Sequence, residues 1–193
     1  MKSVCVFCGS SIGALDGYRD DAIALGERLA ARRIRLVYGG GKVGLMGVVT
    51  DATLRAGGEV LGIIPESLML KEVGHGSLTE LVVTATMHER KAKMEEAAEG
   101  FIALPGGFGT FDELCEILTW AQLGIHQKPI GLLNSGGFYD QLTGFLDFVS
   151  SQGFIRPEHR SLLLEASDPV LLLDRLAAWE PTTVAKWADA TAR

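Results

Sequence analysis

The sequence has few cysteines: only Cys5, Cys8 and Cys115 occur among 193 residues, too few for a disulfide framework in a chain of this size. Cys5 and Cys8 match the C-x-x-C spacing of redox and zinc sites, but they lie in an apolar stretch that has the pattern of a buried strand. Side chains three residues apart on a strand point to opposite faces, so the two sulfurs cannot meet one metal ion or each other. We interpret both as small buried hydrophobic residues.

The chain also lacks an excess of positive charge. Its 18 Lys and Arg residues face 24 Asp and Glu residues, giving a formal net charge of −6, which argues against nucleic acid or an anionic membrane as the main partner. No apolar run approaches the roughly 18 residues of a membrane-spanning helix, and the first residues do not form a secretory signal. We expect a soluble, cytoplasmic protein that holds any anionic ligand with local groups.

The motifs of several enzyme classes are absent as well. No G-x-x-x-x-G-K-[ST] segment occurs, which disfavours a P-loop enzyme, and the first glycine-rich turn lacks the G-x-G-x-x-G pattern of dinucleotide-binding proteins. The histidines are scattered, with no H-E-x-x-H and no paired His/Cys spacing. We therefore expect no metal site and no cofactor.

Glycine, in contrast, is abundant, with 24 residues. It punctuates an alternation of short apolar runs with amphipathic segments of helical length, which is typical of repeated βα units and a parallel sheet. The apolar runs predict strands at 3–8, 35–38, 59–64, 81–84, 100–104, 129–133 and 162–165. The amphipathic segments predict helices at 18–32, 44–56, 88–98, 111–123, 139–151 and 170–178.

The fold class we expect is α/β: a single Rossmann-like domain over residues 1–180, with a parallel sheet of about seven strands flanked by helices. Residues 181–193 would follow it as a C-terminal tail. Thr110 and Ser167 are predicted N-cap residues for the helices after them, and Pro169 suits the first turn of the last helix.

Three glycine-rich turns follow predicted strands, at 8–13, 39–47 and 105–110. The carboxyl ends of parallel strands share one edge of the sheet, where helix N-termini direct free N–H groups into a common crevice. Glycine lets the backbone approach a phosphate closely. A single such turn is weak evidence, because βα turns use glycine for structural reasons alone, but three at one edge indicate a nucleotide-like anionic ligand.

Two charged residues near these turns have alternative interpretations. Thr110 and Glu113 have the spacing of a capping box, and spacing alone favours a cap for Glu113. Arg90 lies in the first turn of a predicted helix, where a cation opposes the helix dipole. Neighbouring lysines and glutamates make a solvated basic face the simpler interpretation of Arg90.

Two motifs identify a family. Residues 105–113 match P-G-G-x-G-T-x-x-E, and residues 87–91 match M-H-x-R-K. Both are hallmarks of the LOG ("Lonely guy") family of cytokinin-activating phosphoribohydrolases, which this chain resembles from Val4 to about Ile155. Relatives have often been labelled lysine decarboxylases, but we find no recognisable pyridoxal-phosphate lysine site in this sequence.

The resemblance implies an N-glycosyl hydrolase that cleaves N6-substituted adenosine 5'-monophosphate, such as N6-isopentenyl-AMP, to free base and ribose 5-phosphate, and that forms a homodimer. It implies that Glu113 and Arg90 are catalytic. The residues expected to bind substrate are Gly106, Gly107, Gly109, Thr110, Met87, Lys91, Ser10, Gly39, Gly40 and Gly41. Two alternatives remain open: a general AMP or purine nucleotide nucleosidase, and a purine-nucleotide-binding module without turnover.

Overall fold

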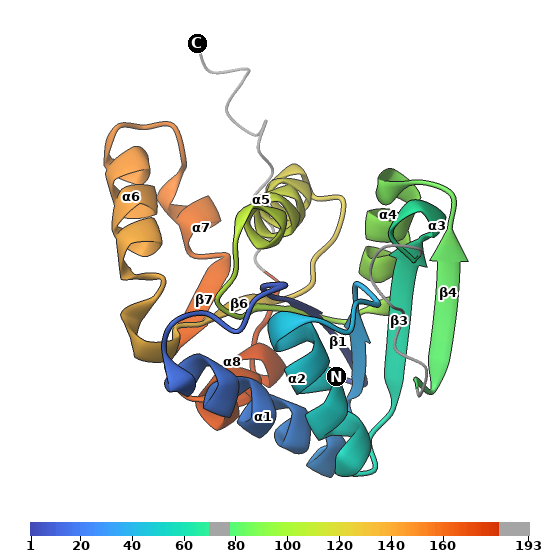
Figure 1. The fold of residues 1–193 in the computed structure, drawn as a ribbon. Helices are drawn as coiled ribbons and strands as arrows, with labels where there is room; N and C mark the ends of the chain where they lie inside the picture. The colour runs from blue at the N-terminus through green and yellow to red at the C-terminus, as the bar shows by residue number, and fades with distance from the viewer. Residues whose placement is uncertain (70–77, 182–193) are drawn as a thin grey trace.

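The computed structural model describes residues 1–69 and 78–181, and its seven strands form one parallel sheet in the order β4-β3-β2-β1-β5-β6-β7 (Figure 1). The strands are β1 Ser3–Phe7, β2 Arg35–Tyr38, β3 Val60–Pro65, β4 Glu80–Thr84, β5 Phe101–Ala103, β6 Ile130–Leu133 and β7 Leu163–Ala166. The helices are α1 Asp16–Ala31, α2 Gly44–Arg55, α3 Glu66–Met69, α4 Met87–Ala97, α5 Phe108–Leu123, α6 Asp140–Ser151, α7 Pro157–Arg160 and α8 Pro169–Ala177, with a 3-10 turn at Ser135–Gly137. The predicted α/β class and all seven predicted strands are confirmed.

Helices cover both faces of the sheet, which explains why its central strands are almost wholly apolar. Figure 1 shows α1, α2 and α8 on one side and α4, α5 and α6 on the other. Residues of β1 and Cys8, which follows it, alternate between two buried clusters: Cys8 packs with α1, α2 and α8, and Cys5 packs with α4, α5 and α6. The expectation that the two thiols point to opposite faces is confirmed, and both are buried and free.

The order of the strands reverses at β1. From β1 the chain builds β2, β3 and β4 toward one edge, and it then returns to place β5 on the other side of β1, followed by β6 and β7. The loops after β1 and β5 therefore leave the sheet in opposite directions and open a crevice at its carboxyl edge. This crevice lies between two of the three glycine-rich turns.

The start of α5 differs from the prediction. The helix was expected to begin at Phe111 with Thr110 as its N-cap, but it begins at Phe108 with Gly107 as N-cap, so the two glycines of 107–109 belong to the helix start. The predicted N-cap of α8, Ser167, is also wrong. Asp168 caps this helix and accepts from the Leu171 N–H at 2.8 Å, with Pro169 in the first turn as expected.

Short helical elements were missed, because α3, α7 and the 3-10 turn span at most four residues each and carry no periodicity. No helix among the described residues is long and apolar enough to cross a membrane. Of the tail expected at 181–193, residues 182–193 lie outside the described residues.

Candidate functional site

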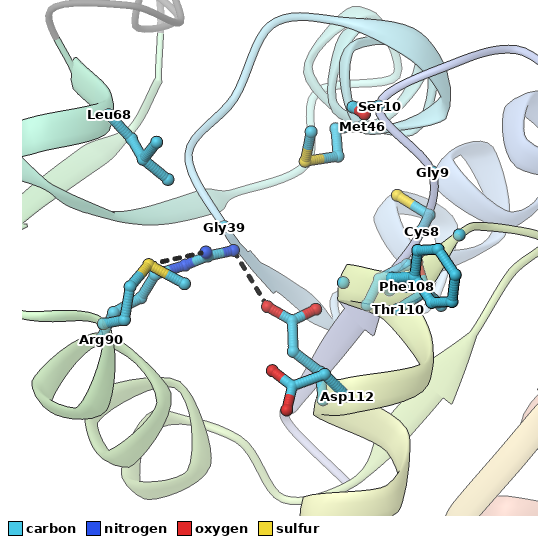
Figure 2. A pocket seen from close by; sticks show the side chains of 15 residues that line it. Cys8, Gly9, Ser10, Gly39, Met46, Leu68, Arg90, Phe108, Thr110 and Asp112 are labelled. Carbon is cyan, nitrogen blue, oxygen red and sulfur yellow. Dashed lines mark hydrogen bonds and ion pairs between the residues drawn. The ribbon is translucent and has the colours of Figure 1, made fainter.

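A cavity of about 230 Å³ lies at the carboxyl edge of the sheet, at the reversal of strand order (Figure 2). Each of the three glycine-rich turns contributes to its wall, and so do α2 and α4. Its lining residues are Val6, Cys8, Gly9, Ser10, Gly39, Met46, Leu68, Met87, Arg90, Gly107, Phe108, Gly109, Thr110, Asp112 and Glu113. The turns that the sequence placed at one edge therefore converge on one cavity.

Arg90 and Glu113 meet inside this cavity. Arg90 Nη2 lies 3.0 Å from Glu113 Oε1, and the two side chains are only 10% and 11% exposed. In Figure 2 the Arg90 guanidinium extends from α4 across the cavity toward α5. The solvated basic face that spacing favoured for Arg90 is therefore wrong, because tertiary contacts bury the guanidinium against a carboxylate.

The guanidinium of Arg90 also needs a glycine beside it. A Cβ atom on Gly39 would collide with Arg90 Nη2 and lie 2.9 Å from its Cζ. Any other residue at 39 would displace the arginine from its partner. The turn after β2 thus shapes the ion pair as well as the wall of the cavity.

A T-x-x-E cap closes a different helix from the one that spacing favoured, with the glutamate accepting from the residue before the N-cap. Thr86 accepts from the Glu89 N–H at 3.1 Å, and Glu89 Oε2 accepts from the Ala85 N–H at 3.0 Å, which closes the start of α4. Because α5 begins at Phe108, Glu113 lies beyond the first turn of its helix and cannot cap it. The carboxylate is directed to the cavity and to Arg90 instead.

Burial dominates the electrostatics of Glu113. It raises the pKa of this carboxyl above its usual range, while the nearby cations Arg90 and Lys91 act to lower it and the acidic Asp112 and Glu116 act to raise it. Burial also raises the pKa of the Cys8 thiol far above its usual value, with the Glu113 charge adding to the effect. Cys8 therefore contributes a neutral thiol to the wall.

The N-terminus of α5 forms one end of the cavity. Gly107 caps the helix with its backbone, and its carbonyl accepts from the Phe111 N–H at 3.0 Å, while the N–H groups of the first turn point outward. Thr110 is only 2% exposed and packs against Gly106, where a Cβ would collide with the Thr110 hydroxyl. The long helix and its glycine-lined start have the geometry of an anion-binding site.

The other residues expected at the site divide into two groups. Ser10, Gly39, Met87, Gly107, Gly109 and Thr110 line the cavity, whereas Gly40, Gly41, Gly106 and Lys91 do not. Gly106 lines an adjoining cavity that shares Gly9, Ser10 and Gly107 with the first. Lys91 Nζ instead pairs with two carboxylates of α5, at 2.7 Å from Asp112 Oδ2 and 3.2 Å from Glu116 Oε2.

Several residues that line the cavity carry no motif from which a site role could be predicted. Asp112 and Phe108 stand at variable positions of the P-G-G-x-G-T-x-x-E motif, and Phe108, 93% exposed, lies at the rim. Leu68 belongs to the short helix after β3, for which the sequence has no signal. Among the residues that the structure describes, no group of three or more His, Cys, Asp or Glu side chains is arranged to hold a metal ion.

Comparisons with known proteins find a matching family model and related sequences. A family model described as "Possible lysine decarboxylase" matches residues 46–176. The cytokinin riboside 5'-monophosphate phosphoribohydrolase LOG5 of Arabidopsis thaliana is 51% identical over 180 residues, which cover 93% of this chain and 79% of the relative. The cytokinin riboside 5'-monophosphate phosphoribohydrolase LOG7, also of Arabidopsis thaliana, is 50% identical over 180 residues, with 93% and 83% of the two chains covered.

Solved structures share the fold at lower identity. The Moco carrier protein from Chlamydomonas reinhardtii superposes with a TM-score of 0.67 at 20% identity, covering 91% of this chain and 97% of that one. The molybdenum cofactor binding protein from Rippkaea orientalis has a TM-score of 0.68 at 22% identity, covering 92% and 97%. At these identities the likeness establishes the Rossmann-like architecture alone.

Proposed function

The chain belongs to the LOG family of cytokinin riboside 5'-monophosphate phosphoribohydrolases, and from this premise we propose that it hydrolyses the N-glycosidic bond of N6-substituted adenosine 5'-monophosphate. The products are the free base and ribose 5-phosphate. The observation that carries the proposal is the buried pair of Arg90 and Glu113, 3.0 Å apart, in a cavity whose far wall is a helix N-terminus. Carboxylate, cation and anion-binding donors are the three elements that this reaction requires.

Glu113 is the proposed base. Cleavage of C1′–N9 develops positive charge on the ribose, which an adjacent carboxylate stabilises, as the carboxylates of glycosidases do. Glu113 also takes a proton from the attacking water while the water oxygen bonds to C1′. The electrons of the C1′–N9 bond leave with the purine, and the proton held by Glu113 passes to the departing base, so the carboxylate is regenerated.

Arg90 is proposed to interact electrostatically with both the substrate and the catalytic base Glu113. Its Nη2 pairs with Glu113, its Nη1 lies 3.8 Å from Met87 Sδ, and its buried Nε has no hydrogen-bond partner among the described residues. The guanidinium therefore retains donors for a ribose hydroxyl, a phosphate oxygen or the edge of the purine. Its charge also opposes the effect of burial on Glu113.

The 5′-phosphate is proposed to bind at the start of α5. First-turn N–H groups from Gly109 and Thr110 and the positive end of a helix of 16 residues favour an anion there. Ser10, from the turn after β1, faces the same cavity and offers a hydroxyl donor. Met46, Leu68 and Met87 supply an apolar wall suited to the base and its N6 substituent.

One experiment separates the proposal from its alternatives. The purified protein is incubated with N6-isopentenyl-AMP, with AMP and with N6-isopentenyladenosine, and released base is measured by chromatography. The proposal expects turnover of the N6-substituted nucleotide above that of AMP and little turnover of the riboside. Faster hydrolysis of AMP would indicate a general AMP nucleosidase, and binding without base release would indicate a nucleotide-binding module.

We also propose that the chain acts as a homodimer in the cytoplasm. Large apolar side chains stand exposed on the α6 side of the molecule: Phe145 at 60%, Phe148 at 59% and Phe154 at 83%. An apolar surface of this kind suits an interface between copies. Light scattering coupled to size-exclusion chromatography measures the oligomeric mass, and cell fractionation tests the location; a monomer at micromolar concentration would contradict the first claim.

A further inference from the structure

Lys91 follows Arg90 on α4 but does not face the cavity. Its ammonium lies between two carboxylates of α5, Asp112 and Glu116, at 2.7 and 3.2 Å. The side chain is only 13% exposed, whereas the neighbouring Lys93, paired with Glu89 at 3.8 Å, is 41% exposed. Consecutive residues of α4 therefore cross to α5 side by side, Arg90 to the catalytic carboxylate and Lys91 to the carboxylates on either side of it.

We propose that Lys91 is a positioning residue, which clamps α4 to α5 and neutralises the acidic residues flanking Glu113, so that Glu113 works as an ionised base beside Arg90. This inference rests on the proposed function. It replaces substrate binding, the role expected for Lys91 from the family motif, with an action through other residues. Lys91 and the substrate would not touch.

The placement of charge on α5 makes the clamp necessary. Asp112 and Glu116 stand one residue before and three residues after Glu113, so three carboxylates occupy one side of a single helix. Like charges three or four residues apart on a helix repel each other, and this applies to Glu113 with Glu116 and to Asp112 with Glu116. Lys91 contacts both of the outer two, and among the residues that the structure describes Arg90 is the cation that contacts the central one. Without Lys91, the guanidinium of Arg90 would be the cation left facing three carboxylates in this described part of the chain.

The charged and titratable groups around Glu113 come from three elements. Arg90 and Lys91 on α4 favour its ionised form, Asp112 and Glu116 on α5 disfavour it, and the buried thiols of Cys5 on β1 and of Cys8 directly after β1 stay neutral. Burial acts to lower the pKa of Lys91, but its bonds to Asp112 and Glu116 raise this pKa overall. The ammonium therefore stays charged across the pH range in which Glu113 would titrate. Lys91 is thus a constant positive charge beside a titrating base.

The test compares the pH dependence of kcat/KM for Lys91→Met and Lys91→Arg with that of the wild type, from about pH 5 to about pH 9. Lys91→Met keeps the aliphatic stem and removes the charge. We expect its acidic limb to move to higher pH, with a loss of kcat that is several-fold at low pH and smaller at high pH, and with little change in KM. Lys91→Arg restores the charge, and its profile should return toward that of the wild type.

Two further variants test the direction of the pH shift and whether the shift is specific to Lys91. Glu116→Gln removes a negative neighbour of Glu113, so its acidic limb should move to lower pH, opposite to Lys91→Met. Lys93→Met is the matched control on the same helix, since the Lys93 side chain is 41% exposed and pairs only within α4 among the described residues, and its profile should match the wild type. Melting temperatures of all four variants show whether each is folded.

The outcomes are distinguishable. A several-fold rise in KM for Lys91→Met with an unmoved pH profile would mean that Lys91 holds the substrate directly, and the inference would be overturned. Equal shifts in Lys91→Met and Lys93→Met would overturn it as well, because the effect would then be one of net charge. The proposed function fails by a separate result, namely normal turnover in Glu113→Gln.

Discussion

Replacing Glu113 by glutamine is the most direct perturbation of the site. The change keeps the length of the side chain and its ability to accept a hydrogen bond, but it removes the charge and the basicity. A general base contributes roughly 10²- to 10⁴-fold to a rate. At 1.36 kcal/mol per tenfold, this is about 3 to 5 kcal/mol of barrier. We therefore expect kcat to fall at least about a hundredfold.

The stability of the same variant is set by two opposed effects. Glutamine forfeits a charge-assisted contact with Arg90, of the kind worth about 1.5 to 3 kcal/mol. It also removes the cost of burying a carboxylate that is 11% exposed, and the raised pKa of Glu113 indicates that this cost exceeds the attraction of the cations. The amide oxygen of glutamine still accepts a hydrogen bond from Arg90, so the buried guanidinium keeps a partner, and the free energy of unfolding should therefore change by about 1 kcal/mol or less, which moves Tm by no more than about 4 °C.

The assay follows release of free base from N6-isopentenyl-AMP by chromatography, with melting followed by calorimetry. Glu96→Gln is the matched control, because Glu96 is an exposed carboxylate on α4 that does not line the cavity. Near-normal turnover in a folded Glu113→Gln variant would falsify the assignment of Glu113 as base. A drop in turnover accompanied by unfolding would instead point to a structural role.

Other expected outcomes follow from the same geometry. Arg90→Ala should abolish base release and lower Tm, because Glu113 would stay buried without its cation. Arg90→Lys should recover activity only in part. Equal activity of the wild type and both variants would exclude Arg90 from the site. Gly39→Ala should resemble Arg90→Lys in turnover, since its methyl group would displace the guanidinium; unchanged kcat would contradict this contact. N6-isopentenyl-AMP should exceed its riboside by orders of magnitude in kcat/KM, and equal values would remove the phosphate site at α5. The pKa of Glu113 is raised in the folded state, so its contribution to stability is present below the unfolded pKa and is lost as pH rises through the folded pKa. Denaturation of both proteins across pH should therefore show the free energy of unfolding of the wild type falling relative to that of Glu113→Gln as pH rises.

The sheet and the edge at which the site lies could be predicted from the order of the residues. Hydrophobic runs and glycine punctuation predicted seven parallel strands, because a strand buried on both faces must be apolar along its whole length. The period-2 geometry of a strand was enough to separate Cys5 from Cys8. The three glycine-rich turns could be assigned to one edge, since parallel strands share a carboxyl edge whatever their order.

Which charged side chains meet depends instead on how α4 packs against α5. Capping signatures are local and ambiguous, and T-x-x-E occurs at both Thr86 and Thr110; the chain uses the first because α5 starts at its glycines. Spacing along α4 cannot tell a solvated face from a buried one, since this depends on how α5 packs after β5 returns to lie beside β1. That return brings Glu113 to Arg90 and the flanking carboxylates to Lys91, contacts between residues distant in sequence that no local pattern records.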